Sequence, residues 1–203
     1  MKLIGRDLSP YARRVAIWCA LQGRAIERER LAATDPAARE AVAAYHPGVR
    51  VPALVLDDGE VLIESASICD YLDETGTPRL VPAAGAERRK VMQHIAIAHA
   101  TTEKIVAVVY EKNRRPAQYT WPEWLDRLVM QVRGGFDAME AFAPARGFLG
   151  GDTPDGSDVA VVVAYQMAEV TNPFLVEERY PRLAALAERA MALDAFADTH
   201  PGN

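Results

Sequence analysis

A serine and a proline open the first helical pattern of the chain, in the stretch LSPYARRV from Leu8 to Val15. With Cys in place of Ser9 and Ala12, this stretch would contain C-P-Y-C, a spacing typical of thiol–disulfide chemistry. Disulfide exchange needs a protein thiolate as the nucleophile, and neither position supplies one. Ser9 offers instead a hydroxyl at a helix N-terminus, where free N–H groups and the macrodipole stabilise an anion. The simpler interpretation is that Ser9 is an N-cap and nothing more.

Two further stretches place polar or special residues where a strand begins or ends. In RVPAL, Pro52 stands at the start of an apolar strand, a position that tolerates proline. A cis Val51–Pro52 bond would be uncommon, at roughly 5–6% of X-Pro bonds. In ESAS, Glu64 and Ser65 end one strand and open a helix. The plain interpretation of this pair is an N-cap and a solvated carboxylate.

Composition limits the classes of partner. The two cysteines, Cys19 and Cys69, lie far apart on apolar helical faces, so we expect inert core residues in a reducing compartment rather than a disulfide framework or a zinc site. Arg6 and Asp7 interrupt any secretory pattern, and no apolar run approaches the roughly 18 residues of a membrane span. The net charge of −5 gives no general attraction to nucleic acid or acidic membranes. We therefore expect a cytoplasmic protein with no metal, nucleic-acid or membrane partner.

The first 75 residues mix strand and helix patterns. Short strands are predicted at residues 2–5 and 26–31, the second near a sheet edge because its charges need water. Two apolar runs flank Asp57-Asp58-Gly59 and predict a β-hairpin, with Gly59 supplying a positive φ. A longer segment separates the second strand from this hairpin.

Two helices are expected between and after these strands. The first follows Ser9 and ends before Gly23, and the second starts near Ser65. We expect either Arg13 or Arg14 to make a structural salt bridge. The apolar residues of the first helix recur at three- and four-residue spacing and predict one buried face, made of Ala16, Ile17, Ala20 and Leu21.

The rest of the chain has helical patterns alone. Two prolines and two glycines between Thr75 and Ala86 predict a linker. The division expected is therefore an α/β domain over residues 1–75, a linker over 76–86 and an all-helical domain over 87–203. Helices are predicted at about 87–113, 122–143, 155–169 and 181–193.

The ordered set SPYARRV, VPAL and ESASICDYLDE, followed by a helical remainder, resembles glutathione transferases of the bacterial, serine-type kind. The resemblance covers essentially the whole chain. It implies a thioredoxin-like, glutathione-binding N-terminal domain followed by an all-α C-terminal domain. In the second half, GGDTPDGSDVAVVVA resembles the capping box of the family, with Asp155 in place of the usual Ser or Thr and Asp158 as the matching acid.

The resemblance assigns roles to six residues around glutathione. It implies that the Ser9 hydroxyl hydrogen-bonds the sulfur and that the backbone of Val51, before a cis Pro52, pairs with the cysteinyl main chain. Glu64 and Ser65 would bind the γ-glutamyl end, through its ammonium and its carboxylate respectively. The sixth residue, Arg50, occupies a place often held by Lys and would meet the glycine carboxylate.

Other positions leave alternatives open. Many relatives have N-P-x-G-K before V-P, whereas His46 and Val49 replace the Asn and the Gly here, so the loop is expected to differ. His46 is interpreted as a loop residue rather than a catalyst. The acceptor-pocket candidates are Tyr11, Tyr110, Arg114 and its neighbour Arg115. Tyr11 either faces the acceptor or packs, and the two arginines line the pocket or complement a helix C-terminus.

Three functions follow from these alternatives. The favoured one is a glutathione transferase for detoxification, in which glutathione is the co-substrate and its thiolate attacks a small, hydrophobic electrophile without a metal. The second is a non-catalytic module that binds glutathione or regulates a partner. A thiol–disulfide oxidoreductase is the least favoured, since positions 9 and 12 hold Ser and Ala. The family resemblance also implies a homodimer.

Overall fold

The computed structural model describes residues 1–202, without the side chain of residue 178, and these residues form two compact units. The first unit contains residues 1–80 and the segment that starts at Leu193. The second unit runs from Val81 to Ala192. The expected α/β half followed by a helical half is confirmed.

A four-stranded mixed sheet forms the centre of the first unit. Its strands are β1 (Lys2–Ile4), β2 (Glu27–Glu29), β3 (Ala53–Val55) and β4 (Val61–Ile63), in the order β2-β1-β3-β4. β1 pairs parallel with β2, and the other neighbours pair antiparallel. The predicted edge position of the second strand and the predicted hairpin are both confirmed, with Gly59 at a φ of 91°.

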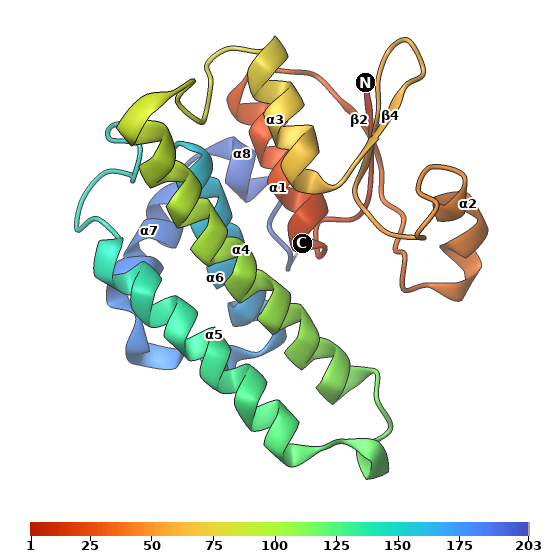
Figure 1. The fold of residues 1–203 in the computed structure, drawn as a ribbon, viewed down its shortest axis with the longest axis vertical. Helices are drawn as coiled ribbons and strands as arrows, with labels where there is room; N and C mark the ends of the chain where they lie inside the picture. The colour runs from red at the N-terminus through yellow and green to blue at the C-terminus, as the bar shows by residue number, and fades with distance from the viewer. Residues whose placement is uncertain (203) are drawn as a thin grey trace. The chain divides into compact units, whose positions relative to one another are not determined.

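The helices of the first unit are α1 (Pro10–Leu21), α2 (Arg39–Ala43), α3 (Ser65–Thr75) and α8 (Asp194–Ala197). A short 3-10 turn, Pro36–Ala38, precedes α2. Helices α1 and α3 lie together on one side of the sheet, and α2 lies on the other (Figure 1). The sheet and α3 bury the apolar side chains that recur along α1.

The prediction of one buried face on the first helix is wrong. Residues 12–19 are buried on every side of α1, whereas Ala20 is exposed. The reason is a third neighbour, α8, which packs on α1. Arg13 donates to the hydroxyl of Thr199 and to the carbonyl of Phe196, each at 3.3 Å. The segment from Leu193, which we expected to belong to the helical domain over 87–203, therefore groups with the first unit.

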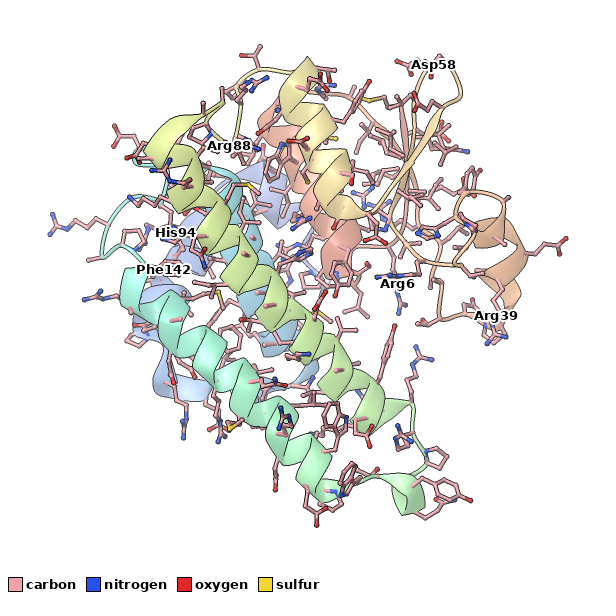
Figure 2. The ribbon with its side chains drawn as sticks, in the orientation of Figure 1. Arg6, Arg39, Asp58, Arg88, His94 and Phe142 are labelled. Carbon is pink, nitrogen blue, oxygen red and sulfur yellow. The ribbon has the colours of Figure 1, made fainter. Side chains whose placement is uncertain are left out.

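The second unit is a helical bundle built around one buried helix. Its helices are α4 (Gly85–Asn113), α5 (Pro122–Phe142), α6 (Gly156–Thr171) and α7 (Pro181–Met191), joined in places by 3-10 turns at Ala117–Tyr119, Pro173–Leu175 and Glu177–Arg179. Residues 156–168 of α6 are buried. Helices α4 and α5 run side by side, and His94 of one stacks on Phe142 of the other with ring centroids 4.0 Å apart (Figures 1 and 2).

A reciprocal capping box starts α6, as the resemblance implied. The Asp155 carboxylate accepts from the backbone N–H of Ser157 at 2.7 Å and of Asp158 at 3.2 Å. The Asp158 carboxylate accepts in return from the N–H of Asp155 at 3.0 Å, and also from Leu149 and Gly150 at 2.8 and 3.0 Å. Burial raises the pKa of Asp158 to about 6, against the opposite influence of these donors. One carboxylate thus ties the preceding loop to the first turn of the buried helix.

Candidate functional site

Three segments of the first unit approach one another where the sequence predicted a binding site. They are the first turns of α1, the loop before β3 and the start of α3. Gly5 marks the first contact, because a Cβ built there would lie 2.7 Å from the Cβ of Ala12 and 3.2 Å from that of Val51. Arg14 makes the second contact, donating from α1 to the Ser65 hydroxyl of α3 at 2.9 Å. The fold therefore brings these three predicted segments together.

Ser9 is the N-cap of α1, as the simpler interpretation expected. Its hydroxyl accepts from the backbone N–H of Ala12 at a long 3.4 Å. A serine hydroxyl can donate one hydrogen bond while it accepts others. The half-buried Ser9 can therefore cap the helix and still donate its O–H to a bound anion at the positive end of the helix.

The Val51–Pro52 bond is cis, as the family resemblance implied. The ladder between β1 and β3 begins at Ala53, so the main chain of Val51 lies outside it. An extended ligand could pair there with the N–H and C=O of Val51 in the manner of an added strand.

Glu64 links β4 to α3 in a backbone conformation that favours glycine. Its φ is 64°, and such left-handed positions in non-glycine residues gather at functional sites. Its carboxylate lies 3.4 Å from the Arg50 guanidinium and 4.0 Å from Nε2 of His46. Because the Arg50 and Glu64 side chains are both more than half exposed, this ion pair contributes little to stability and leaves both groups open to a ligand.

His46 is a buried loop residue that also faces this charged pair. Its Nδ1 accepts from the backbone N–H of Gly48 at 2.9 Å, and its Nε2 faces the Glu64 carboxylate at 4.0 Å. Val49, in the place where relatives have Gly, adopts a φ of 50°. The loop thus has a left-handed residue at that position, and it presents Arg50 to the Glu64 carboxylate.

Ser65 begins α3 and is almost fully buried. Its hydroxyl accepts from Arg14, which leaves its O–H free to donate. The first backbone bond of the helix runs from the N–H of Ile68 to the carbonyl of Glu64, so the preceding N–H groups are the unpaired donors of a helix N-terminus. Hydroxyl and N–H groups together form an arrangement suited to a carboxylate.

The remaining candidates are the four residues predicted for the acceptor pocket. Tyr110 is half-exposed near the end of α4, and Arg114 follows that helix as its C-cap. Arg115 pairs with the buried Glu111 carboxylate at 2.8 Å, which supports a structural role for this arginine. These three residues belong to the second unit, and Tyr11 is half-buried at the second position of α1. Their part in acceptor binding stays a prediction.

The sequence analysis missed the link between Arg14 and Ser65. It anticipated a salt bridge for Arg13 or Arg14, and within residues 1–202 Arg14 makes none. No local pattern could have found this contact, because 51 positions separate the two residues in the chain.

Cys19 and Cys69 are buried as expected, and burial raises the pKa of their thiols to about 11 and about 12. The thiols of both residues therefore stay protonated at neutral pH.

Replacing Gly5 with Ala should disturb the approach of these segments. The new Cβ would collide with Ala12, and the backbone would keep a φ of 134° that L-residues rarely adopt. We expect a loss of about 2–3 kcal/mol in the free energy of unfolding, measured by urea denaturation. Gly59→Ala is the matched control, because its φ is also positive but no atom lies within 4 Å of the added Cβ. Equal losses in the two variants would contradict the packing role of Gly5.

Comparison with known proteins follows the same division of the chain. Residues 8–75 match the model of the glutathione S-transferase N-terminal domain, and residues 122–189 match that of the C-terminal domain. A maleylacetoacetate isomerase of Pseudomonas aeruginosa is 31% identical over 166 residues, covering 79% of this chain and 75% of the relative.

None of the helices in residues 1–202 has the length and apolar character that a membrane crossing requires.

Two solved structures extend the similarity to the whole fold. One is a glutathione S-transferase from Methylobacterium radiotolerans in complex with glutathione sulfonate. Its TM-score is 0.91 at 27% identity, with 98% of this chain and 94% of that chain covered. The other is a holo structure of a maleylpyruvate isomerase, described as a bacterial glutathione S-transferase of the Zeta class. Its TM-score is 0.80 at 29% identity, with 100% and 97% coverage.

Proposed function

This chain belongs to the glutathione S-transferase family, and from that premise we propose that it binds glutathione in its first unit and uses the sulfur as a nucleophile. The observation that carries the proposal is the convergence of the Ser9, Val51 and Ser65 segments in one place. Each segment presents a different kind of donor or acceptor, and together they complement a γ-linked tripeptide. A scaffold without a ligand has no need of this set.

Four contacts are proposed for the ligand. The main chain of Val51 pairs with the cysteinyl residue of glutathione, and the start of α3 holds the γ-glutamyl carboxylate. Glu64 pairs with the γ-glutamyl ammonium, and Arg50 with the glycine carboxylate. Glu64 and Arg50 lie 3.4 Å apart, so their exposed ion pair has to separate for each side chain to meet its own end of the extended tripeptide.

In the proposed reaction, Ser9 stabilises the charge that appears when the thiol loses its proton. The hydroxyl donates to the sulfur and does not act as a base, so the proton leaves to solvent. The thiolate then attacks an electrophilic carbon of a small hydrophobic compound. A new carbon–sulfur bond forms, and either a leaving group departs or an activated double bond takes up the electron pair and then a proton.

A second reaction is favoured by two relatives, the maleylacetoacetate isomerase and the maleylpyruvate isomerase, which act on cis-enoic acids. The same thiolate can add reversibly to a conjugated cis double bond. Rotation about the resulting single bond and elimination of the thiolate would release the trans isomer and regenerate glutathione. Both reactions need the same first unit, and they differ in what the acceptor site holds.

Calorimetry followed by two assays tests the proposal. We expect one glutathione site per chain with a Kd in the micromolar to millimolar range. Turnover of 1-chloro-2,4-dinitrobenzene should consume glutathione stoichiometrically if the chain is a transferase, whereas maleylpyruvate should be converted without glutathione loss if it is an isomerase. Binding without either turnover would favour the non-catalytic module. The absence of binding would overturn the proposed function.

The proposal includes the cellular setting that the family resemblance implies. We propose a cytoplasmic homodimer whose transferase activity serves detoxification. Sedimentation of the full chain at micromolar concentration should give twice the mass of one chain. Oxidoreductase activity is not expected, because positions 9 and 12 hold Ser and Ala and the two cysteines are buried.

A further inference from the structure

Arg14 is a buried cation that forms no salt bridge within residues 1–202. Arg14 is 4% exposed, and its guanidinium donates to the Ser65 hydroxyl at 2.9 Å. Its Nε is buried and has no partner among the described residues. The Ser65 hydroxyl is a neutral partner, and the nearby Cys69 thiol is also neutral because burial keeps it protonated.

Such an arrangement is costly unless something compensates for it. A charge removed from water costs several kcal/mol, which a paired opposite charge offsets only in good geometry. Asp73, two turns further along α3, already accepts through one carboxylate oxygen from Trp18, Gln22 and the backbone of Leu80. A neutral side chain of similar length would link α1 and α3 at a lower cost. A bound anion near the guanidinium would offset this cost, and it would explain why the position holds a charged side chain.

The hydrogen bond to Ser65 points to the same conclusion. Arg14 can only donate, so the Ser65 oxygen must use a lone pair to accept from it. The O–H of Ser65 is then directed away from Arg14. The positive charge behind the oxygen polarises that O–H and makes it a stronger donor. The N–H groups at the start of α3 lie next to this donor in the chain.

We propose that Arg14 is a positioning residue for glutathione, which fixes the Ser65 hydroxyl as a donor to the γ-glutamyl carboxylate and supplies the buried charge that this carboxylate neutralises. The inference rests on the proposed binding of glutathione. Arg14 acts through Ser65 from inside the protein, so it shapes affinity for the co-substrate and leaves the sulfur chemistry at Ser9 unaltered.

The test compares Arg14→Met, Arg14→Lys and Arg24→Met with the wild-type chain. Arg24 is the matched control, because it also tethers α3, donating to Leu72 and Thr75 at the far end of that helix. We expect Arg14→Met to raise the Kd of glutathione about tenfold by calorimetry, and Arg14→Lys to restore part of the loss. Arg24→Met should leave the Kd within about twofold of wild type.

A second ligand separates positioning from general damage. The analogue 4-aminobutyryl-cysteinylglycine keeps the amine and lacks the γ-glutamyl α-carboxylate. Wild type and Arg14→Met should bind it with the same Kd, because the group that Arg14 serves is absent. In steady-state kinetics, Arg14→Met should raise the KM for glutathione about tenfold and leave kcat at saturation within about twofold.

Stability gives an independent readout. Since Arg14→Met removes an uncompensated buried charge, its melting temperature without glutathione should equal or exceed that of wild type. Should this variant fail to fold, the partial effect of Arg14→Lys on the two ligands decides the question. Unchanged glutathione affinity in the variants, or equal loss for both ligands, overturns the role of Arg14. Wild type that binds no glutathione overturns the proposed function itself.

Discussion

Ser9→Ala should slow the glutathione-dependent reaction about 5- to 50-fold at pH 6.5 and much less at pH 9.5. A free thiol with a pKa near 8.5 is about 1% ionised at pH 6.5, whereas a pKa lowered by about two units gives about half thiolate. Two units correspond to about 2.7 kcal/mol. One hydrogen bond to a charged group contributes about 1.5–3 kcal/mol, and the helix N-terminus about 0.3–1 kcal/mol more.

The sign of the pH dependence follows from the charge that Ser9 stabilises. A donor to the thiolate lowers the pKa of bound glutathione, so the fold advantage in thiolate is largest below the lowered pKa, shrinks between the lowered and the ordinary pKa, and disappears above both. The measurement is kcat/KM against pH, together with the thiolate absorbance of bound glutathione near 240 nm. In Ser9→Ala the apparent pKa should rise by one to two units, toward that of the free thiol.

Ser67→Ala is the control for this experiment, since Ser67 is an exposed serine in the first turn of α3. Its pH profile should match that of wild type. An unchanged profile in Ser9→Ala would refute the proposed role of the hydroxyl, and it would leave the helix N-terminus as the main source of stabilisation. The loss of the long 3.4 Å cap should cost little stability, so the variant should fold.

Asp158→Ala should destabilise the second unit by about 3–4 kcal/mol. The variant leaves three backbone N–H groups, of Leu149, Gly150 and Asp155, without their acceptor. A buried donor that loses its partner costs about 1–3 kcal/mol, and the desolvation of the carboxylate that is removed offsets part of this sum. The loss acts on the start of α6, the buried centre of the bundle, so we expect cooperative unfolding at lower urea concentration.

Asp152→Ala is the control in the same loop, because Asp152 is exposed and should change the urea midpoint only slightly. Asp155→Ser should also be mild, since serine is another good N-cap. A loss below about 1 kcal/mol in Asp158→Ala would mean that water replaces the carboxylate as acceptor. The role of the capping box as an anchor of α6 would then be refuted.

Local sequence was sufficient for most elements of the site. Pro10 after Ser9 and the run from Glu64 into Ser65 predicted two helix starts, and the structure places α1 and α3 there. Cap and turn preferences act over a few neighbouring residues, so a short stretch contains the information. The hairpin around Gly59 is predictable for the same reason. The order of the segments, by resemblance, predicted the two-part fold.

Long-range contacts required the tertiary structure. The burial of α1 on every side depends on α8, which starts 173 residues after α1 ends, at Asp194 against Leu21. The pairing of Arg50 with Glu64 depends on where the loop before β3 places its side chain. Neither contact leaves a periodic or compositional pattern, because each joins residues whose neighbours in sequence take no part in it.

The sequence by itself determined where most of the helices and strands begin, which residues of the first unit offer hydroxyl and charged groups, and that neither Ser9 nor Ala12 can supply a thiolate. Only the tertiary structure decided which buried residues contact those groups. It places Arg14, without a carboxylate partner in the described chain, against the Ser65 hydroxyl. The physical reason is that a buried charge is stabilised or destabilised by what surrounds it in space, and these two residues lie 51 positions apart in the chain.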